Sequence, residues 1–232
     1  MKISVVIPAR NEQALLPQTL QSIQSLTRKP DELIVVDNGS ADNTAKIAQT
    51  YGAKVVYIST RGIGLARQKG LEKASGDIIA YTDADTVVPT EWLTKIEKAF
   101  AAPGVVGVFG TYKIHEGHWF FKLHMNHLQD PLARFLYHLQ FPMVPGANFA
   151  ILRQPAIVAG GFPTHFMMLE ENEMARRLMN QGKVVYRPDI VVVTSGRRGK
   201  EGLGIVSRYL VALFYYVFLK RGDLVGFEDI RN

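Results

Sequence analysis

Two carboxylates, Asp83 and Asp85, follow a short apolar run and are separated by one residue. The run at residues 77–82 is rich in β-forming residues and bounded by turn residues, so it predicts a buried strand. Alternate side chains of an extended chain share one side, so both carboxylates are expected to face one point past the strand. Such oxygen ligands suit Mg²⁺ or Mn²⁺, which substrate phosphates often complete. The alternative is a turn and capping role before a helix near Pro89.

Strands and helices alternate through the first half of the chain. The patterns predict strands at residues 2–8, 32–37, 54–59, 77–82 and 105–114, with helices after Asn11 and at residues 43–51, 62–74 and 91–100. Asn11 is a suitable cap for the first helix. This alternation is typical of an α/β fold with a mostly parallel sheet and helices on both faces. Ligands of such sheets bind outside the carboxyl ends of the strands.

Three predicted strands deliver polar groups to this edge. They are the turn at residues 8–12, Asp37, and the pair Asp83 and Asp85. Their convergence favours a binding site over a turn role for the pair. Asp37 has two open interpretations, a turn residue that bonds its own backbone or a ligand contact. Arg67 likewise could be a solvated helix charge or a contact to a phosphate or base.

Composition sets the class of protein. The 232 residues are 47% hydrophobic and 21% charged, which fits one globular domain over residues 1–232. The absence of cysteine excludes disulfides and thiolate chemistry, and the N-terminal apolar run is too short for a signal peptide, so a cytoplasmic location is expected. A net charge of +6 favours anionic partners. Nucleic acid is not favoured, because no element carries an interleaved stripe of basic and aromatic residues.

Histidines gather with aromatic residues after residue 114. A metal site is conceivable there, but no third ligand is evident, and interfacial or core histidines on an amphipathic helix fit better. The residues concerned are His115, His118, His124, His127 and His138.

The segments at residues 5–12, 34–44, 66–70 and 76–85, in this order and spacing, resemble family 2 glycosyltransferases of the GT-A (Rossmann-like) fold. The resemblance covers about the first half of the chain and implies a nucleotide-diphosphate-sugar donor bound by residues 1–114. It implies that Asp85 holds the metal on the diphosphate and that Asp83 lies near the ribose. The residues that it implies for the nucleoside site are Pro8, Arg10, Glu12, Asp37 and Arg67.

The second half, residues 115–202, continues the resemblance as an acceptor and catalytic half. Gly146-Ala147-Asn148 and Gly160-Gly161-Phe162 match the family pattern. Where the family has Glu-Asp at a helix start, this chain has Glu170-Glu171, so Glu171 stands in the place of the catalytic base. Glu is one methylene longer than Asp, which leaves Glu170 and Glu173 as alternatives. Acidic residues in a first helical turn also favour the helix dipole without any catalytic role.

The basic loop at residues 195–200 contains Arg197 and Arg198. These arginines could neutralise the leaving diphosphate or could be a solvated charge run. No tryptophan follows Trp119, so the Gln/Arg-x-x-Arg-Trp motif of the family's processive synthases is absent. The resemblance therefore implies an inverting, non-processive transfer of one sugar.

An apolar, aromatic tail occupies residues 203–232, with its apolar part at Leu203–Leu219. It falls short of the ~20 residues of a membrane span, so an amphipathic helix lying on the inner face of a membrane is one interpretation. In that case the acceptor is a lipid. A core helix, or a helix that joins two copies of the chain, is the other interpretation.

Two other functions compete with glycosyl transfer. A sugar-phosphate nucleotidyltransferase shares a similar fold, but those enzymes have a glycine-rich loop after the first strand, and residues 8–12 contain no glycine. A non-catalytic nucleotide-sugar or membrane-binding protein would keep the donor edge and lose the base. The change at Glu171 keeps that alternative open.

Overall fold

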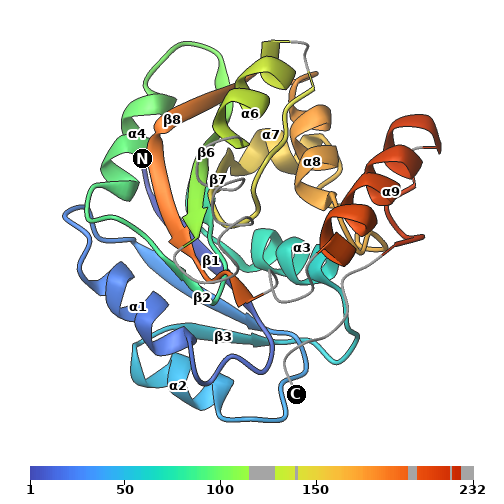
Figure 1. Ribbon diagram of the computed structural model, residues 1–232. Helices are drawn as coiled ribbons and strands as arrows, with labels where there is room; N and C mark the ends of the chain where they lie inside the picture. Colours follow the sequence, from blue (N-terminus) through green and yellow to red (C-terminus); the bar gives the residue numbers. More distant parts are fainter. Residues whose placement is uncertain (115–128, 139–140, 198–202, 220, 226–232) are drawn as a thin grey trace.

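The fold is organised around one sheet with helices on both faces (Figure 1). The computed structural model describes residues 1–114, 129–138, 141–197, 203–219 and 221–225. The strands are β1 Ile3–Ala9, β2 Glu32–Asp37, β3 Lys54–Tyr57, β4 Ile78–Tyr81, β5 Thr86–Val87, β6 Val105–Ile114, β7 Phe149–Leu152 and β8 Lys183–Thr194. The helices are α1 Leu16–Gln24, α2 Thr44–Thr50, α3 Ile63–Lys73, α4 Trp92–Phe100, α6 Gln129–His138, α7 Arg153–Val158, α8 Glu170–Leu178 and α9 Leu203–Leu219.

The mostly parallel sheet predicted from the sequence is confirmed. The strand order is β3-β2-β1-β4-β7-β6-β8-β5. β1 pairs in parallel with β2 and β4, β2 with β3, and β6 with β8, whereas β7 is antiparallel to β4 and β6 and β5 is antiparallel to β8. The position of β7 between β4 and β6 was not expected, because strand partners distant in the chain leave no local pattern.

Alternate residues of each central strand enter different cores, as the period of a strand requires. Ile3, Val5 and Ile7 of β1 belong to the core that also contains side chains of α1 and α4, whereas Val6 belongs to the core that contains side chains of α3 and α8. Both faces of β1 are therefore buried, and this explains why every residue of β1 except Ser4 is apolar. The helices consequently leave the carboxyl ends of the parallel strands as the place for polar groups.

The long strand β8 contains a bulge. Phe109 of β6 pairs with Tyr186 of β8, and Thr111 pairs with Val191. Residues 187–190 therefore bulge where β6 has Gly110 alone, and Pro188 is accommodated there without a ladder bond. A Cβ atom at Gly110 would overlap with the Ile190 carbonyl oxygen and the Asn148 amide.

Asn148 fastens this bulge to the rest of the sheet. Its buried Nδ2 donates to the carbonyl oxygens of Thr111 and Ile190 at 2.8 and 2.9 Å, and its Oδ1 accepts from Trp92 Nε1 at 2.9 Å. Because β8 continues from the bulge toward Thr194 and Arg197, Asn148 helps to fix where those residues lie.

We expect Asn148→Ala to lower the free energy of unfolding by roughly 2–4 kcal/mol, because a buried indole N–H and two carbonyl groups lose their partner. Urea unfolding followed by circular dichroism measures the change. Asn43→Ala is the matched control, because Asn43 is exposed and its side chain contacts Gln13. A loss no larger than that of the control would contradict the fastening role.

The C-terminal helix α9 packs one face against the body of the protein. Ala212 and Tyr216 are buried with Phe166, Met168 and Leu169, and Tyr216 Oη donates to Glu173 Oε2 at 3.0 Å. The core interpretation is therefore correct for this face. Val211, Phe214 and Phe218 lie on another side of the helix and are exposed, and Leu219 is exposed at its end. Within the described ranges, no helix combines the length and apolar content that a membrane span requires.

Candidate active site

The carboxyl ends of β1, β2 and β4 bring the predicted donor residues to one edge of the sheet. Pro8 lies in β1 opposite Val36, and Ala9 pairs with Asp37 at the end of β2. Arg10 and Glu12 follow β1, and Asp83 and Asp85 follow β4. The convergence predicted from the sequence is therefore present in the fold.

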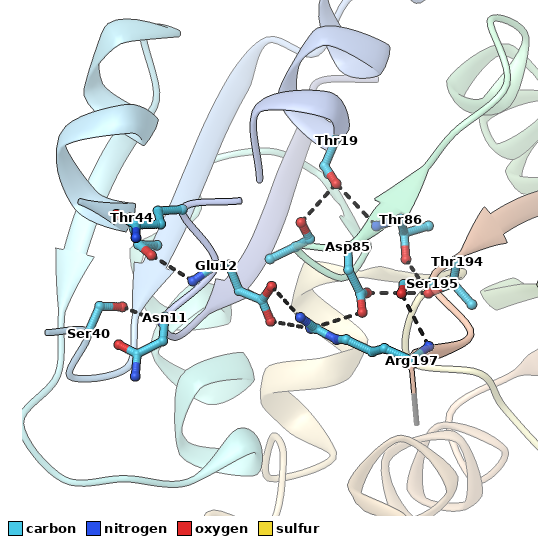
Figure 2. A network of polar contacts seen from close by, with 12 residues as sticks. Asn11, Glu12, Thr19, Ser40, Thr44, Asp85, Thr86, Thr194, Ser195 and Arg197 are labelled. Carbon is cyan, nitrogen blue, oxygen red and sulfur yellow. Dashed lines mark hydrogen bonds and ion pairs between the residues drawn. The ribbon is translucent and has the colours of Figure 1, made fainter. Parts of the chain in front are cut away.

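The turn after β1 differs from the expected helix cap. Asn11 has φ of 49° in the left-handed region, and α1 begins only at Leu16, so Asn11 does not cap it. The Asn11 N–H donates to Ser40 Oγ at 3.0 Å and the Glu12 N–H to Thr44 Oγ1 at 2.8 Å (Figure 2). The turn is thus held by the segment after β2, and this directs the Glu12 carboxylate toward Asp85.

Asp37 is buried and makes a local turn contact. Its Oδ1 accepts the Ser40 N–H at 3.0 Å, which is the backbone bond of the turn interpretation.

Arg197 joins Glu12 to Asp85 (Figure 2). Its Nη1 donates to Glu12 Oε2 at 3.0 Å, its Nη2 contacts Glu12 Oε1, and the same Nη2 lies 3.0 Å from Asp85 Oδ2. The predicted diphosphate residue thus lies beside the predicted metal ligand, paired with two carboxylates. Arg198 lies outside the described residues, as do His115, His118, His124 and His127, while His138 is exposed.

Asp85 is largely buried beside the end of β8. Its Oδ1 accepts from Thr194 Oγ1 at 3.3 Å, and its carbonyl oxygen accepts the Ser195 N–H at 3.1 Å. Burial and the neighbouring Asp83 carboxylate raise the pKa of Asp85 to about 6, against the lowering effect of Arg197. Thr194 had no signal in the sequence, because it meets Asp85 only through the pairing of β5 with β8.

In the part of the chain that the structure describes, Asp83 and Asp85 form ion pairs with different arginines, because the segment that carries them is not extended. The Thr86 N–H donates to the Asp83 carbonyl oxygen at 3.2 Å, so the segment is a turn. Asp83 Oδ1 accepts from Arg67 Nη2, whereas Asp85 contacts Arg197.

The carboxylates at this edge are the side chains that could bind a divalent cation. Among residues 1–114, 129–138, 141–197, 203–219 and 221–225, no three His, Cys, Asp or Glu side chains form a metal-binding group. A carboxylate with one neighbouring carboxylate fits a cation that a diphosphate completes, because Mg²⁺ usually takes one or two protein carboxylates plus phosphates. The residues therefore fit a metal shared with a substrate.

Arg67 is a buried cation surrounded by carboxylates. Its Nε lies 3.1 Å from Glu170 Oε1, and its Nη2 lies 2.9 Å from Glu171 Oε1 and 3.2 Å from Asp83 Oδ1. Its Nη1 donates to the Gly146 carbonyl oxygen at 3.1 Å. With 3% of its side chain exposed, Arg67 is not a solvated helix charge. It links the edge after β4 to the start of α8.

The carboxylates at the start of α8 have different environments. Burial and the charge of Glu170 raise the pKa of Glu171 to about 8, although Arg67 opposes the shift. Burial acts in the same direction on Glu173, but hydrogen bonds from Arg176, Arg177 and Tyr216 lower the pKa of Glu173 to about 2. Glu173 therefore belongs to the contact with α9, while Glu171 suits proton transfer near neutral pH.

Gly146 belongs to the motif Gly146-Ala147-Asn148, but the sequence did not show that it lies beside Arg67 and Glu171. A Cβ atom at this position would overlap with Glu171 Oε1 and Arg67 Nη2. Glycine is therefore required for the ion pair to close.

A family model described as "Glycosyl transferase family 2" matches residues 4–160. Among curated relatives, a probable glycosyltransferase (YdaM) of Bacillus subtilis (strain 168) is 27% identical over 208 residues, which are 78% of this chain and 47% of that protein. The glucosyl-3-phosphoglycerate synthase of Mycobacterium tuberculosis is 41% identical over 96 residues, covering 38% of this chain and 30% of that protein. The chain spans less than half the length of these relatives.

Solved structures show the same fold. A mannosyltransferase of Pyrobaculum calidifontis in complex with GDP-Man and Mn²⁺ superposes with a TM-score of 0.74 at 23% identity, covering 95% of this chain and 65% of that one. The S. aureus protein TarS, residues 1–349 with UDP-GlcNAc, gives 0.68 at 20% identity, covering 85% and 59%. The expected α/β fold is confirmed by these likenesses.

Proposed function

Because the chain belongs to glycosyl transferase family 2, we propose that it moves one sugar from a nucleotide-diphosphate-sugar to an acceptor hydroxyl with inversion at the anomeric carbon. Structural relatives of this fold hold GDP-Man with Mn²⁺ or UDP-GlcNAc. In this proposal Pro8, Arg10, Glu12 and Asp37 line the nucleoside, and Asp83 lies near the ribose.

The observation that carries the proposal is the closeness of the donor edge to a carboxylate suited to proton transfer. Glu171 Oε1 and Asp83 Oδ1 both contact Arg67 Nη2, at 2.9 and 3.2 Å. A donor on the edge after β4 would therefore present its sugar near Glu171. The pKa of about 8 at Glu171 is close to the pH at which a general base is effective.

The proposed reaction is a single displacement. The acceptor oxygen attacks the anomeric carbon while Glu171 takes the hydroxyl proton, and the bond from that carbon to the diphosphate oxygen breaks with its electron pair on the diphosphate. Asp85 would hold Mg²⁺ or Mn²⁺, and such an ion stabilises the negative charge of the leaving diphosphate. Arg197, which reaches the Asp85 carboxylate, is placed to add a second positive charge.

A lipid acceptor is the finer part of the proposal, and it rests on α9. Four apolar side chains of this helix are exposed, with Phe214 and Phe218 in ring contact at 4.8 Å between centroids. The net charge of +6 favours an anionic membrane surface as the occupant of this face. Pairing of α9 between two copies of the chain is the competing outcome.

The experiment is a panel of nucleotide-sugars assayed for nucleoside diphosphate release with Mn²⁺ or Mg²⁺, with and without a membrane lipid extract. Release with one donor, raised at least tenfold by the lipid extract, is the expected result. Transfer to a water-soluble acceptor alone would overturn the lipid acceptor and keep the transferase. Binding of a donor without turnover would favour a non-catalytic nucleotide-sugar-binding protein.

A further inference from the structure

The family resemblance implies a nucleotide contact for Arg67, yet each of its three guanidinium nitrogens has a protein partner. Nε bonds Glu170, Nη1 bonds the Gly146 carbonyl oxygen, and Nη2 bonds Asp83 and Glu171. The side chain is 3% exposed, so its guanidinium faces protein groups rather than solvent. These contacts join three separate parts of the chain: the turn after β4, the loop before β7, and the first turn of α8.

We propose that Arg67 is a positioning residue for the transfer reaction: it holds the Glu171 carboxylate in place and ties it to Asp83 on the donor edge. The inference deepens the proposed function and rests on it for the role of Glu171. It replaces a direct contact of Arg67 with the nucleotide.

The surroundings of Arg67 restrict its movement. Its own carbonyl oxygen accepts a hydrogen bond from Tyr81 Oη at 3.2 Å, and its guanidinium carbon lies 5.9 Å from the centre of the Tyr81 ring. Tyr81 is fully buried in β4. Both the backbone and the side chain of Arg67 are therefore held against β4, the strand that precedes Asp83.

The Glu171 carboxylate lies in the first turn of α8, and the residue before this helix has an unusual backbone conformation. Leu169, directly before α8, has φ of 64°, which is the left-handed region that side chains rarely adopt. Leu169 is buried in the core cluster that receives α9. This local strain starts α8 where its first two carboxylates meet Arg67.

Charge explains why the contact matters for proton transfer. Among the described residues, the charged groups with the largest effect on Glu171 are Glu170 on its own helix, Arg67 on α3, and Asp83 after β4. Arg67 is the positive charge among them, and it opposes the rise in the pKa of Glu171. Without Arg67 the carboxylate would hold its proton to still higher pH and would lose its fixed orientation.

The first arm of the test measures Arg67→Gln and Arg67→Lys without relying on activity. Affinity for UDP and GDP with Mn²⁺ is measured by calorimetry, and the Glu171 carboxyl is titrated by ¹³C NMR, with its signal identified by its loss in Glu171→Gln. Arg67→Gln is expected to raise the Glu171 midpoint by about one pH unit or more. Nucleotide affinity is expected to stay within about threefold, because the guanidinium of Arg67 bonds protein groups. Lys69→Gln, an exposed change on the same helix, should alter neither.

Gly146→Ala is the second variant, and it decides the matter if Arg67→Gln does not fold. It keeps every charged group but places a Cβ atom between Arg67 and Glu171. It should likewise raise the Glu171 midpoint and leave nucleotide affinity unchanged. In both variants kcat at pH 7 should fall by roughly 10- to 10²-fold with little change in the donor KM, and Arg67→Lys should recover part of the Arg67→Gln loss.

The positioning role would be overturned if the titration midpoint of Glu171 does not change in the folded variants. It would also be overturned if their affinity for the nucleotide falls more than tenfold. Failure of the proposed function would look different. In that case the wild type would transfer no sugar from any donor, while the Glu171 midpoint would still respond to Arg67.

Discussion

Glu171→Gln is expected to lower kcat for sugar transfer by roughly 10²- to 10⁴-fold, the usual contribution of a general base. The amide has nearly the shape of the carboxylate and can stay beside Arg67, so donor affinity should change by less than about threefold. Initial rates at saturating donor, together with the donor KM, measure both effects. Glu72→Gln is the matched control, because Glu72 is an exposed carboxylate on α3 that contacts Lys69.

Glu170→Gln tests which of the two neighbouring carboxylates, Glu170 or Glu171, is the general base. Its Oε1 contacts Arg67 Nε, and the amide oxygen can keep this contact. It should therefore retain at least a tenth of the wild-type kcat. The assignment of the base is wrong if Glu171→Gln stays active while Glu170→Gln does not.

Glu171→Gln should also change how the free energy of unfolding depends on pH. The pKa of Glu171 is raised from 4.5 to about 8, so the folded protein binds this proton more tightly than the unfolded chain does. Stability from this group is therefore present at acidic pH and is lost as the pH rises toward 8. Each unit of difference corresponds to roughly 1.4 kcal/mol, which gives an upper value of about 5 kcal/mol. Urea unfolding at pH 5 and pH 9 should show that Glu171→Gln escapes this loss.

Asp85→Ala is expected to lower metal-dependent release of the nucleoside diphosphate by about 10³-fold or more, because a metal on the diphosphate supplies several kcal/mol of charge stabilisation. Calorimetry with Mn²⁺ and the nucleoside diphosphate should show the matching loss of metal binding. Asp189→Ala is the control, since Asp189 is a surface carboxylate that pairs with Arg187. Metal-dependent release that survives in Asp85→Ala would remove Asp85 from the metal site.

Much of the fold could be predicted because its determinants are local. The buried run before Asp83 and the alternation of strands with helices indicated which edge of the sheet would carry polar groups, and the GT-A fold implied by the resemblance is confirmed. The pairing of β4 with β7 could not be predicted, because it joins residues 78–81 to residues 149–152 without any local signal.

The sequence predicted which residues belong to the candidate site, but it did not predict which of them contact one another. Glu171 was identified because it stands where family 2 glycosyltransferases have Glu-Asp at a helix start, whereas its partner Arg67 is 104 positions away and Arg197 meets Glu12 across 185 positions. Such ion pairs depend on how the whole sheet closes. The contact of Glu173 with Tyr216 could not be predicted either, because it joins α8 to α9 across 43 positions.

The place of β7 in the sheet has a consequence for synthesis of the chain. β4 and β6 are both complete before Phe149–Leu152 is translated, yet β7 must lie between them. At about 5–20 residues per second, residues 115–148 take roughly 2–7 s to emerge. During this interval the facing edges of β4 and β6 lack their final partner and are open to pairing with other nascent chains. Ribosome pausing within these residues should therefore increase aggregation far more than pausing after β7 is complete.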